Sequence, residues 1–519
     1  MSHAKLTKKW HSLDKDTCLE LQGRKLHAYL RDCVLPFSPH YRKLFAEKGL
    51  TADDIRTVGD LHKIPFTSKV DLLPTPEAPR KSLEFVLQPD PAKLARRPSV
   101  ILRALLRGRA RVRDELDREW RPTFMTATTG RSTESVAFLY TQHDIRNLGL
   151  GSGRIADMGV STPDNRMLNM FPFAPHLAFW YMYYSGIDRN IFCLSTGGGK
   201  VMGTEGNLRA IQKIKPQVIT GMPTFLYHVL TQAVQEGLRI EGVNVLLLGG
   251  EKVPEGMRRK LTELCTQLGS PNVTVLATYG FTEAKLAWGE CPFPPGQTPP
   301  GYHLYPDLGI FEVIDPETGH VQPDGTGGEI VWTPLEQRGT VVLRYRTGDN
   351  IEHGLTYEPC SCCGRRMPRL MGRISRVSDF RALRFQKIKG TILDFNELEH
   401  ALDDVPGVGS WQIELRKAHD DPLELDEIHL HVTKTGDQSN EALTTQLSNM
   451  LHSRFEMRPN KINFHTQEQM CTLQKVGVAL KEQRVVDNRP KATAPATPSA
   501  NSSAAAPSAG PTPPNTVRP

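Results

Sequence analysis

The sequence predicts an α/β protein: a large N-terminal domain with parallel sheets and a β subdomain, followed by a small α+β domain. Between residues 218 and 277, β-rich apolar runs alternate with helical patterns, as parallel strands joined by crossover helices do. From Leu308 onward, short strands are separated by Asp324-Gly325 and Gly327-Gly328, which is typical of antiparallel β structure. With 519 residues and 39% hydrophobic content, the chain exceeds one ordinary domain and can bury a sizeable core.

The middle of the chain shows the alternation most clearly. The predicted strands are 218–220, 243–248 and 273–277. The predicted helices are 225–236 and 254–268. We place the domain boundary near Arg373, so that residues 1–372 form the large domain and residues 373–490 the small one.

Local sequence composition predicts the structure of the small domain and of the C-terminus. A helix over 396–402 is expected to open with Asn396 as its cap, and residues 428–432 alternate as a strand does. Residues 491–519 are almost wholly Ala, Pro, Ser and Thr, so they have little to bury and are expected to be a disordered tail.

A basic insertion occupies residues from about 80 to 120. The chain carries a net charge of +7, and much of the excess lies between Arg96 and Arg121. Clustered arginines and the run ILRALL at 101–106 would suit a nucleic acid or a membrane surface. Acidic residues follow immediately at helical spacing, so we expect a neutralised helical flap over the protein body and no nucleic-acid partner.

The N-terminal residues and the hydropathy of the chain indicate where the protein is expected to be located. No window approaches the roughly 18 consecutive apolar residues of a membrane span. Residues 1–10 are polar and contain lysine, unlike the apolar run of a signal peptide. We therefore expect a cytoplasmic protein without a membrane span.

Three short segments carry groups suited to a nucleotide. The first reads TATTGRST over 126–133, where hydroxyls and free backbone N–H groups could hold phosphate oxygens. The second reads ATYGFTE over 277–283, where Tyr279 offers a ring for stacking on a base and Glu283 a carboxylate for magnesium. The third reads YRTGD over 345–349 and ends on Asp349, which could accept both hydroxyls of a ribose. Taken singly, an ordinary loop, a buried tyrosine and a turn aspartate explain them equally well.

In this order, the three segments resemble those of the adenylate-forming superfamily, and within it the phenylacetate–CoA ligase-like branch. The similarity runs from about residue 20 to about residue 490. It includes the stretches 38–42 and 61–69, PQVITGMPTFL at 216–226, LLGGE at 247–251 and KEQRVVD at 481–487.

The resemblance implies an ATP-dependent ligase. Such an enzyme activates a carboxylic acid, here of aryl or arylacetic type, to an acyl-adenylate and then transfers the acyl group to a thiol, with coenzyme A as the expected acceptor. It also implies Mg²⁺, a small domain that moves as a lid, and a possible homodimer. The implied catalytic residues are Lys481, with Lys475 in reserve, and Glu283. The implied nucleotide-binding residues are Thr126, Thr128, Thr129, Gly130, Arg131, Gly249, Gly250, Glu251, Thr278, Tyr279, Gly280, Thr282 and Asp349.

An aromatic cluster marks the expected wall of the acid pocket. Phe171, Phe173, His176 and Trp180 follow Asn169, where relatives build that wall. Flat rings favour aryl or arylacetyl acids, although core packing explains the residues equally well.

The cysteines predict a metal site. Nine cysteines in a chain without a secretion signal argue for metal ligands rather than a disulfide framework. The run CSCCG at 360–364 contains both CxC and CxxC pairs, which present two thiolates to a tetrahedral zinc ion. We expect a structural zinc ion held by Cys291, His303, Cys360 and Cys363, with Cys362 as the alternative to Cys363; the resemblance places the zinc ligands of relatives at matching positions. Free thiols and a surface histidine are the competing interpretation.

Some positions depart from the pattern of the superfamily. The phosphate loop usually reads close to SSGTTGKP, whereas this chain has Ala127, Arg131 and Ser132, and Leu480 replaces the usual glycine before Lys481. Two alternatives follow. The acyl acceptor could be a carrier protein or an amine, or the chain could be a zinc-stabilised binding protein of the same fold with weakened catalysis.

Overall fold

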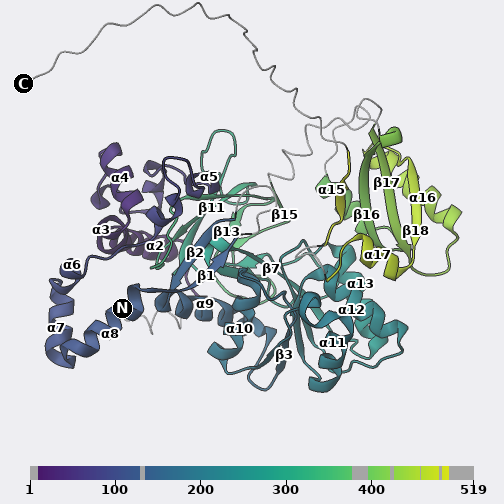
Figure 1. The fold of residues 1–519 in the computed structure, drawn as a ribbon, viewed down its shortest axis with the longest axis horizontal. Helices are drawn as coiled ribbons and strands as arrows, with labels where there is room; N and C mark the ends of the chain where they lie inside the picture. Colours follow the sequence, from purple (N-terminus) through teal and green to yellow (C-terminus); the bar gives the residue numbers. More distant parts are fainter. Residues whose placement is uncertain are drawn as a thin grey trace, which may run out of the picture.

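A computed structural model describes residues 10–128, 135–376, 395–420, 426–455, 457–477 and 482–489. The expected disordered tail lies outside the described residues. The large domain is built around a six-stranded sheet in the order β4-β3-β5-β6-β7-β8 (Figure 1). All neighbouring strands are parallel except β8, which runs antiparallel to β7. The strands are β3 (Arg166–Asn169), β4 (Phe192–Ser195), β5 (Val218–Gly221), β6 (Val245–Leu248), β7 (Thr274–Phe281) and β8 (Leu286–Gly289).

Helices connect these strands and cover the sheet. They are α9 (Gln142–Ile155), with the π-helical turn η5 (Ala156–Val160), α10 (Leu177–Arg189), α11 (Gly199–Ile214), α12 (Pro223–Gln235) and α13 (Glu255–Leu268). Every side chain of β5 and β6 is buried, because helices cover both faces of a parallel sheet. The predicted α/β class and the predicted alternation of strands and helices are confirmed, with element ends that shift by a few residues.

The β subdomain follows. Its four-stranded antiparallel sheet contains β10 (Gly309–Ile314), β11 (Gly328–Pro334), β12 (Tyr345–Ile351) and β15 (Ile374–Arg376). A second antiparallel sheet contains β9 (Tyr302–His303), β13 (Leu355–Thr356) and β14 (Arg369–Leu370). The hairpin of β1 (Pro122–Ala127) and β2 (Ala137–Thr141) lies beside α9. Because β15 pairs with β12, the large domain extends at least to Arg376, slightly beyond the expected boundary.

The N-terminal helices pack against the strand that carries YRTGD. They are α2 (Lys15–Tyr29), η1 (Leu30–Val34), α3 (Leu35–Phe37), α4 (Pro39–Lys48), η2 (Ala52–Asp54), η3 (Val58–Lys63), α5 (Lys69–Leu72) and η4 (Lys81–Phe85). Arg346 N donates to Thr67 O at 2.8 Å, and Leu343 N donates to the Tyr41 hydroxyl at 2.6 Å. These bonds fix the start of β12 to the N-terminal region.

The basic insertion forms a helical hairpin at the edge of the molecule, away from the small domain (Figure 1). It consists of α6 (Pro91–Ala95), α7 (Pro98–Arg107) and α8 (Arg109–Trp120). Trp120 packs edge-on against Phe37, with ring centroids 5.1 Å apart, and anchors the hairpin. The expected neutralisation occurs in part, since Glu115 lies within 3.7 Å of three arginines of the hairpin.

The small domain has its own hydrophobic core and a mixed sheet in the order β18-β17-β16-β19. Its elements are α15 (Phe395–Asp403), β16 (Val408–Lys417), η7 (Ala418–Asp420), β17 (Asp426–Lys434), α16 (Asn440–Phe455), β18 (Lys461–His465), α17 (Gln467–Leu473) and β19 (Val485–Asp487). Because α15 includes Phe395, Asn396 lies inside the helix. The prediction that Asn396 caps this helix is therefore wrong.

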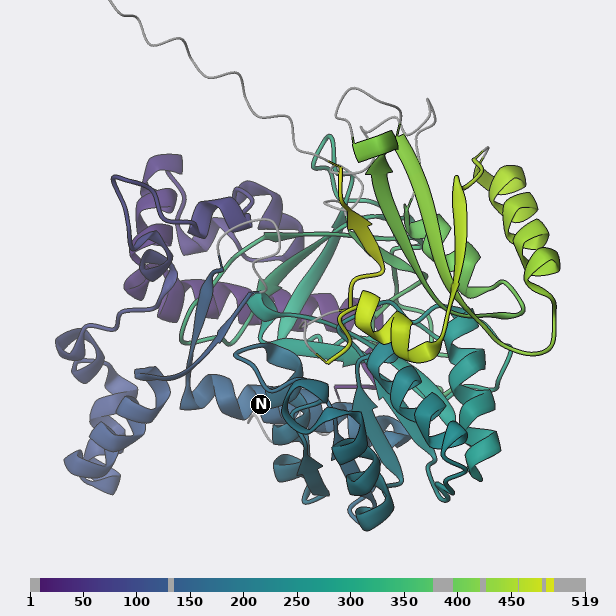
Figure 2. The ribbon, with the colours of Figure 1, turned by 45° about the vertical axis from the view of Figure 1, so that its right-hand side comes forward.

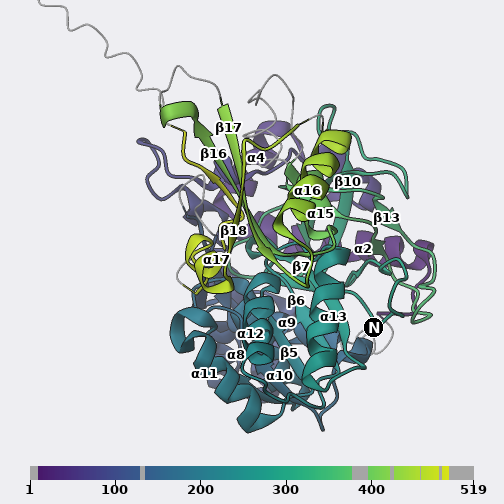
Figure 3. The same cartoon turned by 90° about the vertical axis from the view of Figure 1, so that its right-hand side faces the viewer.

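The two domains meet at α12 and α13 (Figures 2 and 3). Lys260 Nζ of α13 donates to Gly409 O at 2.8 Å, and His228 Nε2 of α12 lies 3.1 Å from Gln474 Oε1. None of the helices in the described ranges combines the length and apolar character needed to cross a membrane.

Candidate functional site

The second and third polar segments meet at the end of β7. The Tyr279 hydroxyl donates to Asp349 Oδ2 at 2.9 Å, and the Tyr345 hydroxyl donates to Glu283 Oε1 at 2.8 Å. Glu283 lies in η6 (Thr282–Ala284), which directly follows β7. Both carboxylates are nine-tenths buried or more, so their hydrogen bonds set their positions. Two stretches more than sixty residues apart therefore form one cluster.

Strand β12 places three of its side chains on one face. Tyr345, Thr347 and Asp349 alternate with more exposed residues, as the two-residue period of a strand requires. The Thr347 hydroxyl donates to Ile330 O at 2.8 Å and accepts from Asp349 N at 3.1 Å, which orients the turn at Asp349. Tyr345 was missed as a site residue. The same alternation would have placed it on the face of Asp349.

The residues after β6 lie beside β7. The Thr278 hydroxyl donates to Leu248 O at 2.9 Å, and a Cβ on Gly249 would lie 2.3 Å from that hydroxyl oxygen. A side chain at 249 would therefore displace the Thr278 hydroxyl from its bond to Leu248 O. Gly250 follows with φ +79°, and the carboxylate of Glu251 accepts from the Thr224 hydroxyl at 2.6 Å. The sequence 249–251 thus borders the same end of the sheet as Thr278.

Gly280 and Thr282 have local roles as well. A Cβ on Gly280 would lie 2.5 Å from the Cβ of Ala287, so glycine at 280 permits the pairing of β7 with β8. Thr282 begins η6, and its carbonyl accepts from Lys285 N at 3.1 Å. These contacts hold the turn that carries Glu283.

The described residues on either side of 129–134 are hydrogen-bonded to each other. Thr128 exchanges backbone and side-chain hydrogen bonds with Val136, each at 3.0 Å. The Thr126 hydroxyl lies 2.9 Å from the Tyr140 hydroxyl in the core. Thr129, Gly130 and Arg131 lie outside the described residues.

The predicted acid-pocket residues divide into separate groups. Phe171 is buried, and its ring would lie 3.6 Å from a Cβ on Gly249, next to the end of β6. His176 Nδ1 lies 2.8 Å from Ala127 O, which ties this segment to β1. Phe173 is 57% exposed and packs edge-on with Trp180 at 5.9 Å. Phe171 thus lies beside Gly249 and His176 beside β1, whereas Phe173 and Trp180 pack in an aromatic cluster with Phe179.

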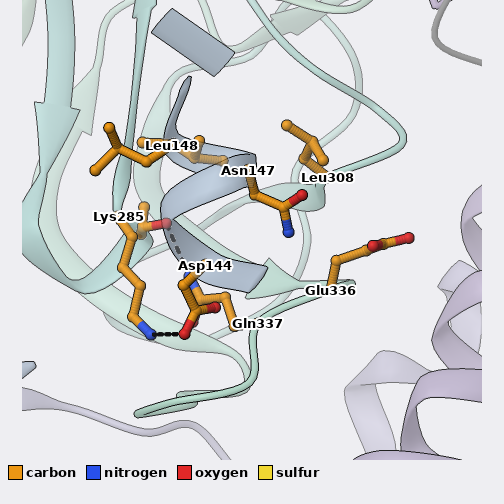
Figure 4. A pocket seen from close by; sticks show the side chains of 9 residues that line it. Asp144, Asn147, Leu148, Lys285, Leu308, Glu336 and Gln337 are labelled. Carbon is orange, nitrogen blue, oxygen red and sulfur yellow. Dashed lines mark hydrogen bonds and ion pairs between the residues drawn. The ribbon is translucent and has the colours of Figure 1, made fainter. Parts of the chain in front are cut away.

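Lys285 and Asp144 form a buried ion pair (Figure 4). Lys285, two residues after Glu283, places Nζ 3.2 Å from Asp144 Oδ2, and both side chains are almost fully buried. Asp144 also accepts from Gly339 N at 2.8 Å, and Lys285 Nζ also donates to Leu139 O at 2.7 Å. The pair lines a small pocket together with Asn147, Leu148 and Gln337. Neither residue was expected from the sequence, since an isolated lysine or aspartate gives no local signal of a buried partner.

Four metal-ligand side chains converge beyond β8. Candidate donor atoms of Cys291, His303, Cys360 and Cys363 all lie within 4.8 Å of one another. The Sγ atoms of Cys291 and Cys360 are 3.7 Å apart, and Cys363 Sγ lies 3.4 Å from His303 Nε2. A tetrahedral ion with metal–sulfur bonds of about 2.3 Å would separate its sulfur ligands by about 3.8 Å, so the donor set fits zinc. The structure places Cys363, and not Cys362, in this group.

The metal-ligand cluster adjoins the tyrosine of the second segment. Tyr302 immediately precedes His303, and its ring centroid lies 6.0 Å from that of Tyr279. Movement of the strand that carries His303 would therefore shift a ring that packs on Tyr279.

The small domain contributes a carboxylate next to Glu251. Glu482 is buried beside Thr224 and Glu251. Burial first, and then the negative charge of Glu251, raise the pKa of Glu482 well above its usual value. Lys481, the expected catalytic lysine, lies outside the described residues.

Comparison with known proteins gives the family. Residues 134–333 match the family described as AMP-binding enzyme. The chain is 26% identical over 355 residues to phenylacetate-coenzyme A ligase of Aromatoleum evansii, covering 64% of this chain and 66% of that protein. It is 26% identical over 365 residues to phenylacetate-coenzyme A ligase of Thermus thermophilus, covering 70% of each. Residues 134–333 therefore carry an AMP-binding enzyme region, and the chain is similar to phenylacetate-coenzyme A ligases.

Solved structures match this chain over almost its whole length. A 2-hydroxyisobutyryl-CoA ligase in the postadenylation state shares 20% sequence identity and a TM-score of 0.69, covering 94% of both chains. The same ligase in the thioesterification state, with coenzyme A, gives a TM-score of 0.58 at 19% identity. These matches confirm the fold.

Proposed function

We propose that this protein activates a carboxylic acid with ATP, forms an acyl-adenylate and then transfers the acyl group to coenzyme A. The observation that carries the proposal is the convergence of Tyr279, Glu283 and Asp349 in one cluster through two hydrogen bonds of 2.9 and 2.8 Å. These are the side chains that the superfamily pattern assigns to base, metal and ribose. The curated relatives, phenylacetate-coenzyme A ligases, support the same reaction.

The reaction has two balanced steps. An oxygen of the carboxylate attacks the α-phosphorus of ATP, and pyrophosphate leaves with the bonding electrons. The thiol sulfur of coenzyme A then attacks the acyl carbon, and AMP leaves as its phosphate oxygen takes the electrons of the broken C–O bond, while the thiol loses its proton. Adenylation is needed because hydroxide is a poor leaving group.

The cluster assigns a task to each side chain. Tyr279 lies against the nucleoside, and Asp349 accepts hydrogen bonds from ribose hydroxyls while it holds the Tyr279 hydroxyl. Glu283 would hold a magnesium ion that arrives on the phosphates and neutralises part of their charge. The loop between Thr128 and Val136 supplies N–H groups and hydroxyls to the phosphates. Gly249 to Glu251 border the base.

Acid-dependent exchange of labelled pyrophosphate into ATP tests the proposal. The full-length protein, with ATP, magnesium and a panel of aryl, arylacetic and short aliphatic acids, is expected to return label only when an acid is present. The aromatic rings near β3 and α10 favour aryl or arylacetic acids. No exchange with any acid would favour the alternative, a zinc-stabilised binding protein of the same fold.

The acceptor requires a separate measurement. Coenzyme A, a carrier-protein thiol and an amine are offered in turn after adenylate formation, and the product is identified by mass. We expect the coenzyme A thioester. If a product forms only with a carrier protein or an amine, the proposed adenylation step would stand, but the acceptor would not be coenzyme A.

Lys481→Ala is expected to lower pyrophosphate exchange by about a hundredfold, because a lysine that stabilises charge on the phosphates acts in the transition state. Glu482, the next residue, lies beside Thr224 and Glu251, at the border of the proposed base site. Lys475→Ala is the matched control, since Lys475 is exposed on the same domain. If Lys475→Ala lost the exchange and Lys481→Ala kept it, the catalytic lysine would be Lys475.

We further propose that Cys291, His303, Cys360 and Cys363 hold a structural zinc ion. Three thiolates and an imidazole would leave no open position, so the ion would pin loops beside Tyr279 rather than take part in the reaction. The packing of Tyr302 on Tyr279 connects the two sites.

Metal content tests this site with a neighbouring cysteine as control. The purified protein is expected to contain about one zinc per chain, Cys363→Ser to lose most of it, and Cys362→Ser to keep it. Removal of zinc by a chelator should lower the midpoint of thermal unfolding and the exchange rate together. Equal zinc content in the two variants would contradict the assignment.

A further inference from the structure

Helix α7 turns its most apolar side toward solvent. Ile101, Leu102, Leu105 and Leu106 are 48%, 58%, 78% and 75% exposed. Their spacing places them on one stripe of the helix, whereas Val100, the buried residue of α7, lies on the opposite side. The stripe therefore points away from the protein body. This orientation reverses the usual arrangement, in which the apolar face of a helix packs on the core and polar residues face water.

The hairpin that carries this stripe holds almost all of the net charge of the protein. Residues 91–121 contain ten lysine and arginine residues and four acidic residues, while the whole chain has a net charge of +7. Glu115 forms ion pairs with three of the arginines, but Arg109 and Arg113 are exposed at the start of α8. The exposed leucines therefore lie beside a region of net positive charge.

We propose that the α7–α8 hairpin docks on the surface of an anionic lipid bilayer. The four apolar side chains of α7 would enter the boundary between headgroups and acyl chains, and the arginines would contact the lipid phosphates. Exposed leucines and isoleucine beside arginines are the combination that such an interface recognises. The hairpin lies at the edge of the molecule opposite the small domain, so the domain contacts at α12 and α13 would stay free of the bilayer (Figure 1).

The positive charge of the hairpin distinguishes a lipid surface from the other partners that could cover the apolar stripe. Two copies of this chain would bring two strongly basic hairpins together, which opposes self-association through α7. A nucleic acid would use the arginines but would leave four large apolar side chains uncovered. An anionic bilayer would both neutralise the arginines and cover the exposed apolar side chains.

Flotation of the full-length protein with lipid vesicles tests the proposal. We expect binding to vesicles of phosphatidylcholine mixed with phosphatidylglycerol, little binding to phosphatidylcholine alone, and weaker binding as salt is raised. Leu105→Gln with Leu106→Gln should lower the partition coefficient by about tenfold, because two apolar side chains no longer leave water. Arg109→Gln with Arg113→Gln should also lower it by about tenfold and reduce its salt dependence.

Val70→Gln is the matched control, since Val70 is 69% exposed but lies on α5, outside the hairpin. It should bind vesicles as the unmodified protein does, and all variants should retain the unmodified thermal midpoint. Failure to bind acidic vesicles, or binding unchanged by the leucine pair, would overturn the proposal. So would a dimer in light scattering that the leucine pair abolishes, or binding to duplex DNA in place of vesicles.

Discussion

Asp349→Ala is expected to lower kcat/KM for ATP in pyrophosphate exchange by about a thousandfold. A carboxylate that accepts two ribose hydroxyls contributes about 1.5–3 kcal/mol for each hydrogen bond, and each factor of ten in rate corresponds to about 1.4 kcal/mol. The substitution also removes the acceptor of the Tyr279 hydroxyl, which the structure places 2.9 Å from Asp349 Oδ2. The nucleoside contact and the orientation of its tyrosine would be lost together.

A nucleotide analogue shows whether this loss comes from the ribose contact. The unmodified protein should use 2′-deoxy-ATP about tenfold or more less efficiently than ATP, whereas Asp349→Ala should barely distinguish the two. Asp164→Ala, at an exposed position in a turn of the same domain, should behave as the unmodified protein does. If Asp349→Ala still discriminated against 2′-deoxy-ATP by the original factor, Asp349 would not bind the ribose.

Lys285→Met is expected to lower the free energy of unfolding by about 3–5 kcal/mol, because it leaves the buried carboxylate of Asp144 without its cation. Both side chains are almost fully buried, and Lys285 Nζ lies 3.2 Å from Asp144 Oδ2. The variant should also lose exchange activity, since Lys285 ends the turn that carries Glu283. Denaturant unfolding at pH 7 measures the stability, and Lys213→Met, on an exposed side of α11, is the control.

The pH dependence of this loss has a definite sign. Burial acts to raise the pKa of Asp144, but Lys285 and the backbone N–H groups of Thr141 and Arg338 outweigh it and hold the pKa below its usual value. The native carboxylate therefore stabilises the protein above its unfolded pKa of about 3.9, and this contribution is lost as the pH falls through the lower native value. In Lys285→Met, burial without the cation should raise the pKa, so the added penalty is largest near neutral pH. The stability gap between the two proteins should narrow from pH 7 toward about pH 4.

A double substitution checks the cause. Asp144→Asn combined with Lys285→Met should be less destabilised than Lys285→Met alone, because no buried charge remains unpaired. A stability gap that does not change with pH, or a double variant as unstable as the single one, would rule out the ion pair as the source of the effect.

Much of the large domain was predictable because its signals are local. The apolar runs around β5, β6 and β7 and the helical periods of α12 and α13 lie within short windows of sequence, and their alternation predicts parallel strands with crossover helices. The cap at Asn396 failed because the ends of helices depend on single residues, and α15 begins one residue earlier.

The sequence also limited the candidate metal ligands but left one choice open. Spacing allowed either Cys362 or Cys363 to complete the set with Cys360. Only the fold brings Cys363 Sγ to 3.4 Å from His303 Nε2 and leaves Cys362 beside Ser361. A difference of one residue in a turn changes the direction of a side chain, and no local pattern encodes that direction.

By itself, the sequence determined the α/β class, the order of the three polar segments and the types of side chain they bring. Tertiary structure alone decided that Tyr345 holds Glu283, that Lys285 pairs with Asp144, and that the apolar stripe of α7 faces outward. The physical reason is the sequence separation over which each kind of interaction acts. Periodicity acts over a few neighbouring residues, whereas these contacts join segments 62 and 141 residues apart or depend on which side of a helix the body covers.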